Sequence, residues 1–266
     1  MEDITIGYLS WKRNNIFKQT LTSHKDNGLY NIIPPKNRLI YFQEISTIDI
    51  DLAKQFECNY MGSNENVGIL NAFIKLVENC ETEYFIFCEN DWYLVENDII
   101  TRKILEDSIE MLDRGITNIV RLRHRIKYGE PLYSKPSNIV EWLQYNYNRF
   151  PYKLESLSWL DEPNKVYNNV MDEYDGNYKW YIVSLEHQRW SNNVFICKTS
   201  YIREVILPLV LYFIETDKYS GLEDILINYT KYIGRDNTLD DIIKIYSLVK
   251  IAGGEGLFMH TDKVVL

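Results

Sequence analysis

The segment from Tyr84 to Leu94 constrains the fold more than any other part of the sequence. Tyr84 to Cys88 is a short run of aromatic and apolar residues bounded by acids, which is typical of a strand buried on both faces. The polarity reverses at its end, where Glu89 and Asp91 place two carboxylates with one residue between them. Open α/β sheets bind ligands at the carboxyl ends of their strands. The segment therefore predicts a buried strand that ends in a candidate site for a divalent cation.

Predicted strands and helices alternate around this segment. Strand-like patterns occupy residues 3–10, 38–44, 58–61, 84–88, 116–126, 181–184 and 193–198, and helical patterns occupy residues 16–24, 51–56, 67–79, 99–114, 200–211, 220–233 and 239–251. This rhythm indicates an α/β protein with a mostly parallel central sheet flanked by helices, in one domain over residues 1–266. Regular patterning fades between residues 129 and 179, which predicts an irregular insertion, and such segments are commonly functional loops.

Composition excludes several classes of protein. A net charge of −9 and a pI near 5.1 argue against a nucleic-acid surface, which needs clustered Lys and Arg. The cysteines lack the spacing of a zinc site or a disulfide framework, so a reducing, cytoplasmic location is expected: Cys58, Cys80, Cys88 and Cys197. We expect no transmembrane segment, because the longest apolar run, residues 205–214, is too short and contains Pro208. Alanine is scarce beside abundant Ile, Asn, Lys and Tyr, which suggests an AT-rich genome such as that of a large DNA virus.

Short motifs follow one another in an informative order. The first strand and its polar loop precede an Asn66-Val-Gly68 turn, then Glu89-Asn-Asp91, Leu222-Glu-Asp224 at a helix start, and Gly256-Leu-Phe-Met-His260 near the end. This order resembles the nucleotide-sugar-dependent glycosyltransferases of the GT-A fold, most of all the inverting family-2 type, over nearly the whole chain. The resemblance implies that residues 1–115 bind a nucleotide diphosphate sugar, such as a UDP- or GDP-sugar. It implies that residues 116–266, with the irregular insertion, bind a hydroxyl acceptor on a glycan or glycoconjugate.

The acidic motif and the late histidine match the metal-binding positions of that family. The resemblance implies that Asp91 and His260 hold Mn²⁺ or Mg²⁺, which neutralises the charge that grows on the leaving diphosphate. An imidazole ligand favours Mn²⁺ over Mg²⁺. Glu89 stands where Asp is commoner in the family, so we expect it at the ribose or at a metal-bound water, with Asn90 also at the donor. The alternative is that both acids cap a loop.

Two neighbouring acids compete for the role of catalytic base. Ser220 and Glu223 form a capping box, which gives Glu223 a task at the helix start. Asp224 is left free to take the acceptor proton, and it matches the base of the family's Glu-Asp motif. An ordinary acidic first turn, favoured by the helix dipole, is the alternative.

Further side chains are assigned to the two substrates by the same resemblance. Those expected at the nucleotide are Ser10, Arg13, Glu44 and Asn66. Those expected at the acceptor and the donor sugar are Trp190, Asn192 and Asn193, where packing or turn formation is an equal alternative. Three arginines share one face of the strand at 116–126, which indicates an anionic neighbour or solvated ion pairs: Arg121, Arg123 and Arg125.

Two other functions remain open. A nucleotidyltransferase also uses strand-end acids and a metal, but the sequence has no Gly-rich, Arg/Lys-bearing phosphate loop. A catalytically silent relative that only binds a nucleotide or a glycan is the second alternative.

Overall fold

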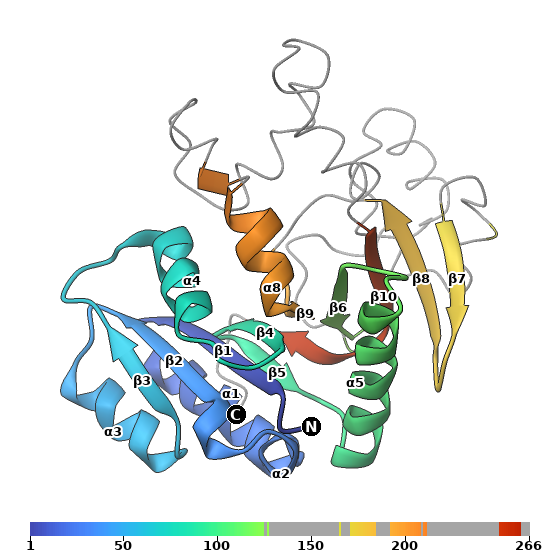
Figure 1. Cartoon of the computed structure of the whole chain (residues 1–266). Coiled ribbons are helices and arrows are strands. Elements are labelled where there is room, and N and C mark those ends of the chain that lie inside the picture. The colour runs from blue at the N-terminus through green and yellow to red at the C-terminus, as the bar shows by residue number, and fades with distance from the viewer. Residues whose placement is uncertain are drawn as a thin grey trace, which may run out of the picture.

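A computed structural model describes residues 1–124, 127, 165, 171–184, 192–208, 210–211 and 250–261. Its centre is a ten-stranded sheet in the order β3-β2-β1-β4-β9-β6-β10-β8-β7, and β5 pairs with β10 beside this path (Figure 1). The strands are β1 (Ile4–Trp11), β2 (Arg38–Gln43), β3 (Asn59–Gly62), β4 (Tyr84–Glu89), β5 (Trp92–Leu94), β6 (Ile119–Arg123), β7 (Met171–Asp175), β8 (Lys179–Ser184), β9 (Phe195–Lys198) and β10 (Lys250–His260).

Helices cover both faces of this sheet. They are α1 (Asn14–Asp26), α2 (Leu29–Ile32), α3 (Thr47–Gln55), α4 (Gly68–Glu78), α5 (Asp98–Asp113) and α8 (Thr199–Tyr201), with a 3₁₀ turn η1 (Pro35–Asn37) and a π-helical turn η3 (Ile202–Ile206). Residues of α1, α2, α3 and α5 belong to one core cluster, and residues of α4 and η3 belong to the other. Figure 1 shows α4 and α8 on one side of the sheet and α1 to α3 on the other. The predicted α/β class is confirmed.

Strand directions divide the sheet. Strands β3, β2, β1 and β4 are parallel to one another, whereas β9 is antiparallel to both β4 and β6. β10 is parallel to β6 but antiparallel to β8 and β5. The carboxyl ends of β1, β2 and β4 therefore meet at one edge, as the βαβ pattern predicts.

β4 is the doubly buried strand that the sequence predicts. Tyr84, Ile86 and Cys88 pack in the core cluster that contains α1. Phe85 and Phe87 pack in the cluster that contains α4. Because alternate side chains fill both faces, every position of β4 before Glu89 is buried.

Helix α3 begins earlier than residue 51, where the sequence analysis places its start. Ser46 and Asp49 form a capping box: Ser46 Oγ accepts from the Asp49 amide at 3.4 Å, and Asp49 Oδ2 accepts from the Ser46 amide at 2.8 Å. This reciprocal cap satisfies amides at the helix start and fixes it at Thr47.

The irregular region predicted at 129–179 contains a strand, β7, at its end. Asp107 of α5 accepts hydrogen bonds from the Asn177 amide, the Asn177 side chain, the Tyr178 amide and the Trp180 indole, at 2.8 to 2.9 Å. These bonds fix the turn between β7 and β8. The anchor is more than sixty residues away along the chain, so no local pattern reveals it.

The glycine-rich segment near residue 256 is also a strand, β10, which the sequence analysis does not predict; its predicted helix over 239–251 overlaps the start of β10. A Cβ on Gly254 would lie 2.7 Å from the Trp180 ring, and one on Gly256 would lie 2.1 Å from the Arg123 carbonyl oxygen. Glycine therefore lets β10 approach β6 and β8 closely. The predicted helices at 220–233 and 239–251 lie outside the described residues, except for residues 250 and 251, which belong to β10.

Two further expectations concern the whole chain. The four cysteines are buried and carry free thiols. Within the described ranges, no helix has the length and apolar character needed to cross a bilayer.

Candidate functional site

Strained backbone marks the loops that follow β1 and β2. Lys12 and Arg13 have φ of 56° and 55°, and Glu44 has φ of 55°. Non-glycine residues adopt this left-handed conformation rarely, and such residues cluster at functional sites. The conformation turns the chain sharply from β1 into α1 at the carboxyl edge of the sheet.

Three side chains meet at this edge around the carboxylate of Asp91. Asp91 Oδ2 lies 3.4 Å from Arg13 Nη1 and 3.5 Å from His260 Nε2. The other oxygen, Asp91 Oδ1, is buried and has no hydrogen-bond partner within the part of the chain that the structure describes. We refer to Asp91, Arg13 and His260 as the Asp91 cluster. A buried acceptor without a partner costs about 1–3 kcal/mol, so Oδ1 has the chemistry to accept a cation or a hydrogen-bond donor.

The short strand β5 explains how residues so distant in sequence meet. Trp92 lies opposite His260 in the antiparallel pair of β5 and β10, and their rings are 4.9 Å apart. The Thr261 amide donates to the Asp91 carbonyl oxygen at 2.9 Å. The proximity of Asp91 and His260 that the sequence motifs predict is therefore present.

The Asp91 cluster has donor atoms that suit a divalent cation. Asp91 supplies carboxylate oxygens and His260 an imidazole nitrogen, a combination that Mn²⁺ accepts. In the described part of the chain, no three His, Cys, Asp or Glu side chains gather closely enough to hold a metal. Asp91 and His260 would therefore supply two of the donor groups around such a cation.

Ser10 and Asn90 lie beneath the Asp91 cluster. Both side chains are buried, and Asn90 Nδ2 donates to Ser10 Oγ at 3.4 Å and to the Lys12 carbonyl at 3.3 Å. Thr20 of α1 donates to the Asn90 carbonyl at 2.8 Å. These bonds connect the loop after β1 to the loop after β4. Ser10 and Asn90 therefore stabilise the positions of the two loops that carry Arg13 and Asp91.

Glu44 follows β2 and stands beside the loop after β1. Its carboxylate accepts from the Trp11 indole at 3.1 Å and lies 3.2 Å from Lys12 Nζ. The hydrogen bonds from Trp11 and Lys12 hold the pKa of Glu44 below its usual value. Trp11 is 45% exposed, and Lys12 Nζ lies 4.8 Å from the centroid of its ring.

The remaining predicted residues divide into three groups. Glu89 ends β4 and is half-buried, whereas Asn66 is exposed and its side chain accepts from the Gly68 amide at 2.9 Å in the turn before α4. Asn192 is buried and Asn193 half-buried, just before β9, and the antiparallel register of β9 with β4 puts them at the same edge as Glu89. Trp190, Glu223 and Asp224 lie outside the described residues.

Several residues of the site escaped the sequence analysis. Trp92 packs on His260, and the Arg123 guanidinium carbon lies 5.5 Å from the Trp92 ring centroid. Trp11, Lys12 and Thr20 join the site through the contacts given above. Only Trp11 had a visible signal, since it opens the polar turn after the first strand; the others depend on partners far along the chain.

No protein-family model and no curated protein matches the chain. Among solved structures, TarS of S. aureus, residues 1–349, matches with a TM-score of 0.53 at 12% identity over 98% of this chain. The same fragment in complex with UDP matches with a TM-score of 0.53 at 11% identity. The chain shares its fold with TarS.

Two limits apply to these matches. The chain spans 60% of the length of the solved TarS fragment. A mannosyltransferase from Pyrobaculum calidifontis, solved with GDP-Man and Mn²⁺, matches 50% of the chain at 9% identity with a TM-score of 0.37, too low to support an argument.

Proposed function

We propose that the chain is a metal-dependent glycosyltransferase that moves a sugar from a nucleotide diphosphate donor to a hydroxyl acceptor. The donor is a UDP- or GDP-sugar, the acceptor a glycan or glycoconjugate, and the transfer inverts the anomeric centre. One observation carries the proposal: the buried Asp91 carboxylate sits between Arg13 and His260 at the carboxyl edge of the sheet, with Oδ1 unpaired. The fold shared with TarS, which has been solved with UDP, supports it.

Asp91 and His260 hold Mn²⁺ or Mg²⁺ in this proposal. The bound cation would neutralise charge on the diphosphate as it departs. Arg13, which lies 48% exposed beside Asp91, is the side chain that reaches the phosphate oxygens once the carboxylate has a cation. Glu89 contacts the ribose or a metal-bound water.

The nucleoside lies over the ends of β1 and β2. Trp11 offers an exposed ring for stacking on the base, and Glu44, already held by Trp11 and Lys12, offers an acceptor for a base or ribose donor. Ser10 and Asn90 hold the loop in place, and Asn66 shapes the next turn along the same edge.

The acceptor approaches from the opposite side in residues 116–266. Asp224 removes the proton from the attacking hydroxyl, which requires one carboxylate on the face away from the diphosphate. Glu223 caps the helix start. Trp190 stacks on a sugar face, and Asn192 and Asn193 bind hydroxyl groups.

A thermal-shift screen of nucleotide sugars tests the donor site. We expect UDP- or GDP-sugars to raise the melting temperature with Mn²⁺ present and to have little effect with a chelator, because a ligand stabilises only the state that it binds. No shift with any nucleotide sugar or nucleotide diphosphate in Mn²⁺ would overturn the proposal. Asp172→Asn, an exposed carboxylate on β7 at the far end of the sheet, is the control that should respond like the wild type.

The catalytic base is tested separately. Asp224→Asn should abolish sugar transfer while leaving the Mn²⁺-dependent shift intact, because the base touches the acceptor and not the donor. Full transfer activity in Asp224→Asn would refute the assignment. A wild-type chain that binds donor but never transfers sugar would instead support the silent relative.

A further inference from the structure

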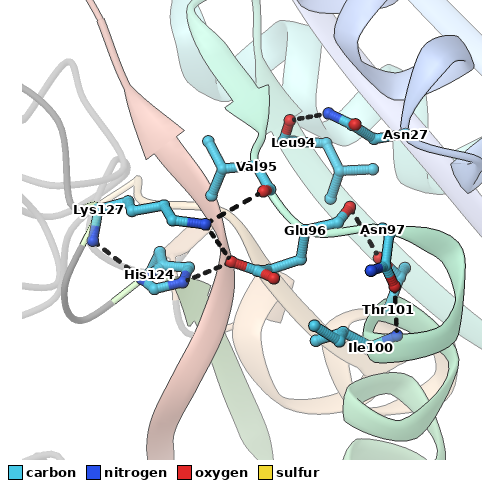
Figure 2. Close-up of polar contacts among 9 residues, drawn as sticks. All are labelled: Asn27, Leu94, Val95, Glu96, Asn97, Ile100, Thr101, His124 and Lys127. Carbon is cyan, nitrogen blue, oxygen red and sulfur yellow. Dashed lines mark hydrogen bonds and ion pairs between the residues drawn. The ribbon is translucent and has the colours of Figure 1, made fainter.

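A second polar cluster lies where β5 and β6 end (Figure 2). Glu96 follows β5, and its Oε1 is 3.0 Å from His124 Nε2 and 2.7 Å from Lys127 Nζ. The side chains of Glu96 and His124 are 14% and 7% exposed, whereas that of Lys127 is 52% exposed. We refer to Glu96, His124 and Lys127 as the Glu96 cluster. The hydrogen bond between the buried Glu96 and His124 side chains is stronger than a surface ion pair, and Lys127 joins the cluster from an exposed position.

Hydrogen bonding fixes the protonation of His124. The backbone N–H of Lys127 donates to His124 Nδ1 at 3.0 Å, so Nδ1 is an acceptor and Nε2 carries the ring proton. Nε2 donates that proton to Glu96. Both ring nitrogens are therefore occupied, and His124 is unsuited to act as a base or a metal ligand. The Glu96 cluster therefore has a structural role.

The Glu96 cluster spans β10. The Val95 amide donates to the Leu257 carbonyl at 3.0 Å from one side, and the His124 amide donates to the Phe258 carbonyl at 2.8 Å from the other. Figure 2 shows the β10 ribbon passing between the backbone of Glu96 and that of His124 and Lys127. The side chains thus join the two neighbours of β10 across it.

β10 is irregular at this place. Its register against β6 shifts between Gly253 and Phe258, and Gly256 has φ of 72°. Such a bulge interrupts the hydrogen-bond ladder and bends the strand. The Glu96 cluster therefore supplies a side-chain connection where the ladder is weakest.

We propose that the Glu96 cluster positions His260 against Asp91. His260 lies two residues beyond Phe258 on β10, and Asp91 directly precedes β5, so the register of β5 with β10 sets the distance between them. Joining the end of β5 to the end of β6 confines β10 between them and holds His260 in place. The inference rests on the proposed function, because the cluster acts on the cation through His260.

Two measurements on the full chain test this proposal. The first is amide hydrogen exchange of residues 256–261 without metal, and the second is Mn²⁺ binding followed by electron paramagnetic resonance, where nitrogen coupling reports the imidazole. Glu96→Ala should speed exchange in that segment, weaken Mn²⁺ binding about tenfold or more and reduce the nitrogen coupling, as loss of supporting contacts does elsewhere. Glu96→Gln, which still accepts one hydrogen bond, should lose less.

Control variants distinguish an effect on the position of His260 from a general loss of folding stability. Glu110→Ala removes an exposed ion pair with Arg114, 2.8 Å long, on the neighbouring helix α5, and should change neither measurement. If Glu96→Ala does not fold, Lys127→Ala removes one partner of Glu96 from an exposed position and should show the same changes at smaller size.

The outcomes distinguish this inference from the function on which it rests. Unchanged exchange in the Glu96 variants would overturn the proposal, whether or not the chain binds metal. Faster exchange with unaltered Mn²⁺ affinity and nitrogen coupling would also overturn it. Failure of the wild-type chain to bind Mn²⁺ would instead overturn the proposed function.

Discussion

The Asp91 carboxylate has the contacts on which the proposed function depends. Its Oδ2 lies 3.4 Å from Arg13 Nη1 and 3.5 Å from His260 Nε2, and its Oδ1 is buried with no hydrogen-bond partner among the described residues. A carboxylate placed only to cap a loop would direct its oxygens at nearby amides. The arrangement instead leaves coordination capacity at the edge where three strands end.

His24 provides a test of the buried polar structure below this edge. It accepts from the Tyr8 hydroxyl at Nδ1, 2.7 Å away, and donates to the Trp92 carbonyl from Nε2, 2.9 Å away, so the folded protein holds it neutral. Burial lowers its pKa from 6.5 to about 4, and the Trp92 bond only partly opposes this. As the pH falls below 6.5, the unfolded chain takes up the proton first. Folding stability is therefore lost progressively down to about pH 4.

The loss from His24 should reach about 3 kcal/mol at the acid end, since each pKa unit corresponds to about 1.4 kcal/mol. Urea unfolding at several pH values measures it. His24→Gln removes the titrating group, so the stability of the wild type relative to that variant should fall between pH 6.5 and 4. Parallel pH profiles for the two proteins would contradict this account.

At the scale of elements, one carboxylate anchors the β7–β8 hairpin to α5. Asp107→Ala leaves the Trp180 indole and two backbone amides without their acceptor, and Trp180 is fully buried. We expect a loss of about 3 kcal/mol or more in unfolding free energy, because each orphaned buried donor costs about 1–3 kcal/mol. Urea denaturation checks this prediction. Asp172→Ala on the same hairpin is exposed and should change little; equal effects would contradict the anchor.

Two glycines of β10 form a matched pair for testing the approach of β10 to β6. Gly256 has φ of 72°, and a Cβ there would meet the Arg123 carbonyl oxygen at 2.1 Å, whereas a Cβ on Gly253 meets nothing within 4 Å. Backbone strain alone costs about 1–3 kcal/mol, and the clash with Arg123 adds to it, so Gly256→Ala should lower the unfolding free energy by more than that amount. The same substitution should weaken Mn²⁺ binding because it displaces His260. Gly253→Ala should retain both properties. Similar melting temperatures and Mn²⁺ affinities for the two variants would contradict the role of this bulge.

At the scale of the whole molecule, local patterns predicted what local forces determine. The doubly buried β4 and the acid pair after it follow from residue types in one short run, whereas the pairing of Asp91 with His260 was implied only by the family resemblance. β5 is three residues long, which is too short to show the alternation of apolar and polar residues that marks a strand. It is recognised as a strand by its pairing with β10. β7 depends on Asp107, and β10 depends on glycines that look like a turn until Trp180 and Arg123 are placed against them.

Within the site, too, some residues were predicted from the sequence and others depend on contacts between distant parts of the chain. Arg13 and Glu44 were assigned to the nucleotide by the family resemblance, and the structure places both in the loops that follow β1 and β2. Trp92 and the Glu96 cluster were not predicted, because their roles arise from ring and ion contacts between β5, β6 and β10. Such contacts join residues about thirty or more positions apart, and a single sequence carries no record of them.

The central claim is that Asp91 helps to hold a divalent cation on which nucleotide binding depends. Calorimetric titration measures this dependence. UDP, and then GDP, is titrated into the wild-type chain and into Asp91→Asn, once with Mn²⁺ and once with a chelator. Asp172→Asn serves as the control. We predict Mn²⁺-dependent binding of one nucleotide by the wild type and by Asp172→Asn, and affinity at least about tenfold weaker in Asp91→Asn, or about 1.4 kcal/mol. Equal affinity in Asp91→Asn, or wild-type binding that is the same without Mn²⁺, would contradict the account.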